Sequence, residues 1–91
     1  MTHILKADYE GASLELQFDS HPEVSLKING VQRDHASSPD SAIILRLGSP
    51  VQTGYEQHEF IQAVIQYDQN GISASLHSGD LLIAQQEVPV S

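Results

Sequence analysis

The sequence predicts an all-β protein, an antiparallel β-sandwich or a small flattened barrel of about seven or eight short strands joined mainly by hairpins. Three observations lead to this fold class. Apolar and polar residues alternate along most of the chain, with the two-residue period of a half-buried strand. Turn-forming residue pairs separate these runs at short intervals. Finally, no stretch shows the period of an amphipathic helix.

The chain is predicted to begin with two strands, residues 3–9 and 14–18, joined by a turn at Glu10-Gly11. In the second strand three apolar residues alternate with polar ones, as expected where one face of a strand lies in the core. Pro22 ends this region, because proline lacks the N–H group that a strand donates to its neighbour.

A hairpin is predicted at Asn29-Gly30, a residue pair that favours a type I′ turn because both residues tolerate positive φ. Symmetric pairing about this turn places Ile28 opposite Val31. It also places Leu26 opposite Arg33, so we expect Arg33 near an edge, with its apolar stem over the core and its charged end in water.

The middle of the chain is predicted to hold one central strand between two loops. Residues 34–41 are polar and show no strand or helix pattern, which predicts a loop. Residues 42–47 are apolar on both faces, which favours a central strand. Gly48 and Pro50 are expected to end that strand, so residues 48–57 are predicted to form a second loop.

Residues 58–85 are predicted to form a three-stranded meander. Every second residue from Ile61 to Tyr67 is apolar, and Asn70-Gly71 supplies residues that tolerate positive φ for the first reversal. Gly79-Asp80 fits a type II′ turn, in which glycine comes first. That turn gives three predicted residue pairs: Ser78 with Leu81, His77 with Leu82, and Leu76 with Ile83.

Length and composition restrict the class of protein. We expect residues 1–91 to form a single domain with a frayed tail over residues 88–91. Four Lys and Arg residues against twelve Asp and Glu give a formal charge of −8, which argues against nucleic acid and membrane partners. The chain has no cysteine, signal peptide or membrane span, so a cytoplasmic location is expected.

No motif in the sequence predicts catalysis, a metal site or a cofactor. The five histidines lack the short spacings of a zinc site, and no glycine-rich phosphate loop precedes a helix. Ser75 and His77 share the polar face of one predicted strand, but no nucleophile elbow accompanies them. We therefore expect no metal and no cofactor, and we lean against an enzyme.

The densest polar and aromatic cluster supplies the candidate binding residues Tyr55, Glu56, His58 and Phe60. One interpretation is a small hydrolase-like or ligand-binding site over residues 48–58, with His58 as base or proton donor. The other is a solvated strand entrance without a function of its own.

The preferred function is a non-enzymatic interaction or accessory module that acts through a sheet face or edge. Leu82, Val64, Ile44 and Phe60 fall on the outward side of their predicted strands. If these residues are adjacent, they form an apolar patch of the kind that marks a homodimer or a contact with another protein.

Overall fold

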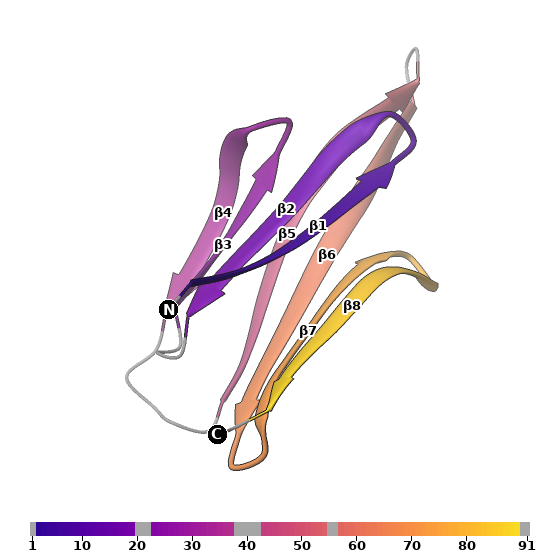
Figure 1. The fold of residues 1–91 in the computed structure, drawn as a ribbon. Coiled ribbons are helices and arrows are strands. Elements are labelled where there is room, and N and C mark those ends of the chain that lie inside the picture. Colours follow the sequence, from indigo (N-terminus) through magenta and orange to yellow (C-terminus); the bar gives the residue numbers. More distant parts are fainter. Residues whose placement is uncertain (1, 20–22, 38–42, 55–56, 90–91) are drawn as a thin grey trace.

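A computed structural model describes residues 2–19, 23–37, 43–54 and 57–89 of the chain. These residues form eight strands and no helix, arranged as two four-stranded antiparallel sheets that pack as a β-sandwich (Figure 1), so the predicted fold class is confirmed. No membrane-spanning helix occurs in this part of the chain. The strands are β1 (Thr2–Tyr9), β2 (Ala12–Asp19), β3 (Glu23–Ile28), β4 (Val31–Ser37), β5 (Ile43–Gly54), β6 (Gln57–Asp68), β7 (Gly71–Ser78) and β8 (Leu81–Pro89).

Each sheet is a meander in which every strand pairs with the next strand in the sequence. The first sheet has the order β1-β2-β3-β4, and the second has the order β5-β6-β7-β8. Strand β4 lies beside β5, and β1 lies beside β8, but no backbone ladder joins either pair. The two sheets therefore remain separate layers and do not close into a barrel.

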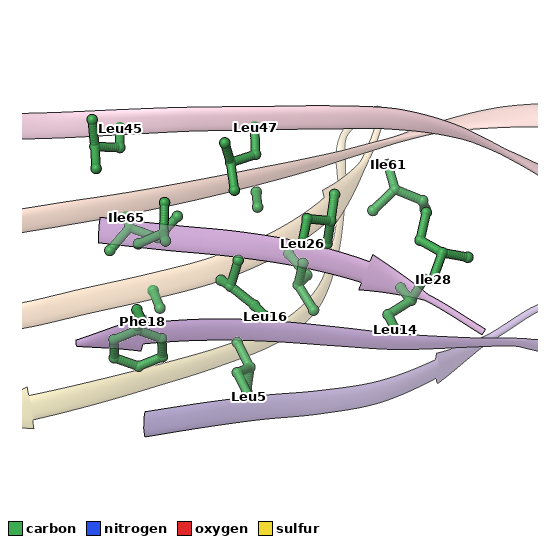
Figure 2. Packing of buried hydrophobic residues seen from close by; sticks show 14 of the residues in the cluster. Leu5, Leu14, Leu16, Phe18, Leu26, Ile28, Leu45, Leu47, Ile61 and Ile65 are labelled. Carbon is green, nitrogen blue, oxygen red and sulfur yellow. The ribbon is translucent and has the colours of Figure 1, made fainter. Parts of the chain in front are cut away.

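The core lies between the two sheets and is mainly aliphatic. Figure 2 shows labelled side chains from both sheets pointing into the space between them. Leu16 on β2 and Ile65 on β6 are each 0% exposed. Because successive residues of a strand face opposite sides, the predicted alternation places one set in the core and the other in solvent.

Tyr67 adds a polar link between the sheets. The side chain is buried, and its hydroxyl on β6 donates a hydrogen bond to the main-chain oxygen of Asp19 on β2, 2.7 Å away. Burial raises the pKa of Tyr67 above its ordinary value, because the charged phenolate loses more solvation than the neutral phenol. The neutral side chain thus fits both the apolar core and its hydrogen-bond acceptor.

A β-bulge corrects the predicted register of the last hairpin. The pairs Ser78–Leu81 and His77–Leu82 are confirmed. The pairing register then shifts by one residue, because Ile83 on β8 has no partner on β7, so Leu76 pairs with Ala84 and not with Ile83. Without the bulge, Glu87 would lie opposite Ile72, on the core side of the sheet. With it, Val88 takes that position and the carboxylate of Glu87 stays in water.

The hairpin of β3 and β4 contains a similar bulge. Ile28 pairs with Val31 as predicted, but Leu26 pairs with Asp34 and not with Arg33. The extra residue leaves Arg33 exposed and places Ala36 on the core side opposite Val24. In the β7–β8 hairpin the extra residue keeps Glu87 off the core side, whereas in the β3–β4 hairpin it places Asp34 opposite Leu26 in place of Arg33, and the Asp34 carboxylate there accepts a hydrogen bond from the N–H of Gly48.

Parts of both predicted loops are strand in the structure. Residues 34–37 belong to β4, and residues 38–42 lie outside the described residues. Strand β5 continues through Gly48 and Pro50 to Gly54, so the predicted loop over 48–57 is mostly strand. It is also an edge strand and not a central one. Proline is tolerated there because an edge strand needs no donor on its outer side.

Two of the predicted turns have the expected backbone geometry. Asn29 and Gly30 have φ angles of 53° and 82°, as a type I′ turn requires, and Gly79 has a φ of 57°. The turn between β6 and β7 differs, because only Gly71 has a positive φ there, and the carboxylate of Asp68 accepts hydrogen bonds from the N–H groups of Asn70 and Gly71. A side-chain cap thus replaces the predicted asparagine conformation.

Candidate functional site

The outer face of the second sheet carries few charges and is the first part of the candidate site. Cross-strand register aligns its side chains in rows that run from β5 to β8. Among the strand residues whose side chains are described, the charged ones on this face are Arg46 and Glu87, on opposite edge strands, and Asp68 at the end of β6, whose carboxylate caps the β6–β7 turn. The other outward-facing residues are Ile44, Gly48, Pro50, His58, Phe60, Gln62, Val64, Gln66, Ser73, Ser75, His77, Leu82 and Gln85.

The outer face of the first sheet is built differently. Lys6, Glu15 and Lys27 form one cross-strand row, in which Lys6 Nζ lies 3.8 Å from Glu15 Oε1. The Gln17 amide also donates a hydrogen bond to Glu15, at 2.8 Å. Acidic residues continue this polar surface at Asp8, Asp19 and Glu23. This face interacts with water and salt through its charges, whereas the second sheet presents amides, hydroxyls and aliphatic groups.

The predicted binding residues are divided by the structure. Tyr55 and Glu56 lie outside the described residues. His58 and Phe60 are exposed on the outward side of β6, and Phe60 is 58% exposed. The Phe60 ring lies over Gly48, because a Cβ atom added to that glycine would overlap the ring. Phe60 thus shields backbone of the neighbouring strand while it presents an aromatic surface to solvent.

The four apolar residues predicted to form a patch share one face, but they do not form a continuous patch. Val64 lies between Arg46 and Ser75 in its cross-strand row. Leu82 pairs with His77 at the far end of another row. Polar side chains therefore separate the apolar ones, and the face resembles the mixed surface of a non-obligate interface.

Ser75 and His77 are the one pair in this face that could suggest nucleophilic chemistry. The Ser75 hydroxyl lies 2.8 Å from Nε2 of His77. The cross-strand neighbours of His77 are Gln62 and Leu82, so its row supplies no carboxylate to orient the imidazole. The hydrolase-like interpretation of residues 48–58 gains no support from this pair and stays a prediction.

Strands β5 and β6 continue beyond the end of β7, and this extension is the second part of the candidate site. We call residues 49–54 and 57–60 the arm. Ile61 pairs with Ser78, the last residue of β7, and within the described part of the chain no residue pairs with β6 at residues 57–60 on that side. Figure 1 shows β5 and β6 reaching past the β7–β8 hairpin.

A polar cluster that the sequence interpretation missed lies at the base of the arm. The side chain of Tyr9 on β1 interacts with the side chains of Ser78 and Glu59. The interaction with Ser78 lowers the pKa of Tyr9, but the Glu59 carboxylate and burial raise it, so the pKa lies above its ordinary value. The signal was present in the sequence, because Glu59 precedes the run of core residues from Ile61 at the same two-residue period.

Hollows in the described surface lie outside the core. One of about 370 Å³ lies at the β6–β7 turn, between Asp68 and Val88, and another of about 220 Å³ is lined by residues of the first sheet such as Gln17, Ser25 and His35. In the described ranges, no group of three or more His, Asp or Glu side chains could hold a metal ion. Comparisons with family models, curated proteins and solved structures found no match to this chain.

Proposed function

We propose that this protein is a non-enzymatic interaction module that assembles with a second copy of itself through the outer face of the second sheet. The observation that carries this proposal is the small number of charges on that face of a chain whose formal charge is −8. Acidic chains repel one another, so two copies approach most easily through the face with the fewest charges. Depletion of charged residues is also the compositional mark of an interface core.

The size of the molecule supports the same partner. The chain measures 44 × 20 × 20 Å, so its long face is about 44 by 20 Å. A stable interface buries roughly 800 Å² on each partner, which a face of this size can supply. A smaller surface, such as the tip of one hairpin, would not be sufficient for a stable dimer of this kind.

Arg46 and Glu87, the charged residues on the two edge strands of this face, support a particular symmetry. A two-fold axis that runs along the strands between β6 and β7 would set β5 of one copy across from β8 of the other. Arg46 would then lie across from Gln85 of the partner subunit. The partner's Glu87, the next outward-facing residue along β8, would be within reach of Arg46. The same contact occurs twice in a two-fold dimer, so Arg46 and Glu87 of each copy both lie near an opposite charge.

Two isoleucines provide a matched test of this face. Ile44 on β5 and Ile4 on β1 are each 44% exposed, lie on edge strands and pair with a glutamine. Ile44→Glu would place a carboxylate opposite the partner's Glu87, and we expect the dimer dissociation constant to rise about 100-fold. Ile4→Glu adds the same charge to the first sheet and should change the constant less than threefold.

The measurement is the solution mass by sedimentation equilibrium over a range of protein concentrations. A wild-type chain that becomes dimeric with rising concentration, and an Ile44→Glu variant that remains monomeric, would support the proposal. A monomeric wild-type chain at millimolar concentration would refute it. Equal weakening by both substitutions would also refute it, because added charge alone would then explain the change.

A further inference from the structure

The main-chain groups of the arm can be assigned to its two sides from one hydrogen bond. The N–H group of Gly48 donates to Oδ2 of Asp34 on β4, at 2.9 Å. Strand β4 lies on the side of β5 away from β6, so this N–H points away from the β5–β6 ladder. Gly48 and its partner Gln62 are therefore one of the pairs that exchange no hydrogen bond across the ladder.

The same assignment holds for every second pair along the arm. Pro50 pairs with Phe60 and Gln52 pairs with His58, without a register shift between these positions and Gly48. The N–H and C=O groups of Phe60 and His58 consequently point away from β5, toward the side where β7 has already ended. Within the described ranges of the chain, these groups form a short strand edge that pairs with no other strand.

The opposite edge of β5 is protected at two positions. The outward N–H of Gly48, at the start of the arm, is bonded to Asp34, and Pro50 has no N–H to offer. On β6 the described residues 58 and 60 have neither a proline nor a side-chain acceptor at the corresponding groups. Within the described residues, His58 and Phe60 thus offer consecutive main-chain groups to another strand.

The space beside this edge has a floor and one end wall, which we call the notch. The β1–β2 hairpin supplies the floor, because the Tyr9 side chain reaches both Glu59 on β6 and Ser78 at the end of β7. The turn between β7 and β8 closes one end. In Figure 1 the β1–β2 hairpin extends farther along β6 than the β7–β8 hairpin does.

We infer that the notch binds an extended segment of another protein by strand addition, with a Lys or Arg residue opposite Glu59 and an apolar residue opposite Phe60. In an antiparallel arrangement the segment would continue the line of β7. It would exchange main-chain hydrogen bonds with Phe60 and His58. The residue between those two contacts would face inward, toward the carboxylate of Glu59 and the hydroxyl of Tyr9.

Charge and side-chain type determine this choice of partner. Glu59 is half-buried on the inward side of the edge, while Glu10 and Asp80 lie in the two turns that border the notch. Opposite charges across neighbouring strands stabilise pairing, and like charges destabilise it. On the outward side, the exposed ring of Phe60 favours an aromatic or β-branched neighbour.

A second copy of the chain does not satisfy these conditions. If two β6 edges paired with each other, the register that joins Phe60 to His58 of the partner subunit would place Glu59 against the partner's Glu59. That like-charge contact would lie in a partly enclosed site, where it is costly. The edge therefore selects a segment of different sequence, separately from the self-association proposed for the sheet face.

The experiment uses the full chain and the peptide Phe-Lys-Val-Thr-Val-amide, whose first three residues are designed to lie opposite Phe60, Glu59 and His58; its amino terminus is left free because Ser78 already pairs with Ile61. Binding is followed by NMR titration and by hydrogen exchange of individual amides. We expect slower exchange at the amides of His58 and Phe60. The peptide with Glu in place of Lys should bind at least about fivefold more weakly.

Two variants and one modified peptide complete the test. Glu59→Gln should remove the preference for Lys over Glu, whereas Glu87→Gln, which removes the same charge elsewhere on the second sheet, should leave it intact. A peptide N-methylated at its third residue lacks the N–H that would donate to the C=O of His58, so it should bind more weakly. Absence of binding, equal binding of the Lys and Glu peptides, or shifts confined to other strands would overturn the inference. A monomeric wild-type mass would affect only the proposed dimer.

Discussion

The two sheets of this molecule have similar inner faces and different outer faces. Inside, both present aliphatic side chains that are fully buried, such as Leu16 in the first sheet and Ile65 in the second. Outside, the first sheet carries a row of alternating charges, and the second carries amides, hydroxyls and scattered apolar groups. Both inner faces are shielded from water in the core, so both consist mainly of aliphatic side chains. The outer faces differ as expected if the second sheet contacts another protein, as proposed.

The edges of the sheets show a similar contrast. Beside β5, Asp34 accepts the outward N–H of Gly48, and Pro50 has no N–H, so two neighbouring positions of this edge offer no free donor. At the arm, β6 retains main-chain groups at His58 and Phe60 beside an inward carboxylate. Protection of one edge and not of its neighbour is what we expect if the second edge pairs with another chain.

Substitutions in the core, which have the largest expected effect, test whether the two inner faces contribute equally to stability. Leu16→Ala and Ile65→Ala each remove a fully buried side chain from the centre of a sheet, and each should reduce the free energy of unfolding by about 2–5 kcal/mol. Urea denaturation in an Ile44→Glu background would measure both without a contribution from association. A loss below about 1 kcal/mol in only one sheet would show that the two layers do not share one core.

The difference between the outer faces can be tested with the charges of the proposed dimer. Arg46→Glu and Glu87→Arg should each weaken self-association by about tenfold, because each leaves like charges facing one another across the two-fold axis. The double variant exchanges the charges and should restore association to within about threefold of wild type. Sedimentation equilibrium measures all four constants. Additive losses in the double variant would contradict the proposed symmetry.

Much of this fold was predictable because a strand with one buried face repeats every second residue. The alternation from Ile61 to Tyr67 and the turns at Asn29-Gly30 and Gly79-Asp80 led to the correct strands and to the correct first pairs of two hairpins. These signals are local, since they depend on residues within a few positions of one another.

The remaining features depend on contacts between distant parts of the chain. The apolar residues on both faces of β5 suggested a central strand, but β5 lies at an edge, covered in part by β4 through Asp34. The bulges shift the register so that Glu87 faces outward in the last hairpin and so that Asp34, in place of Arg33, lies opposite Leu26 in the β3–β4 hairpin. The cluster of Tyr9, Ser78 and Glu59 joins three strands from two sheets, and only Glu59 gave a sign of it in the sequence.

The link between the sheets gives a smaller and pH-dependent prediction. Tyr67→Phe removes the hydrogen bond to Asp19 and should reduce the free energy of unfolding by about 1 kcal/mol at neutral pH. Burial raises the pKa of Tyr67 in the folded chain, so its neutral form stabilises the fold at low and neutral pH. That contribution is lost as the pH rises above the ordinary tyrosine value of 10.0.

Unfolding by urea, followed by circular dichroism between pH 7 and 11, would measure this dependence. The wild-type chain should lose stability more steeply above pH 10 than Tyr67→Phe does. A Tyr9→Phe variant, which leaves the link between the sheets in place, should keep the share of the alkaline loss that belongs to Tyr67. If Tyr67→Phe were as sensitive to alkaline pH as the wild type, another group would control this loss.

The smallest effect concerns the row of charges on the first sheet. Glu15 lies between Lys6 and Lys27, so Glu15→Gln should cost about 0.5 kcal/mol at low ionic strength, a small value because Lys6 is largely exposed. The cost should fall toward zero in 1 M NaCl, where the Debye length is about 3 Å.

The matched substitution in the second sheet is Glu87→Gln, whose cross-strand neighbour is Ser73. Measured by urea denaturation of the monomeric Ile44→Glu background, it should change stability by less than about 0.2 kcal/mol at either salt concentration. Equal salt dependence in both sheets would mean that the outer faces differ in composition but not in electrostatics, and it would remove the main support for assigning the interface to the second sheet.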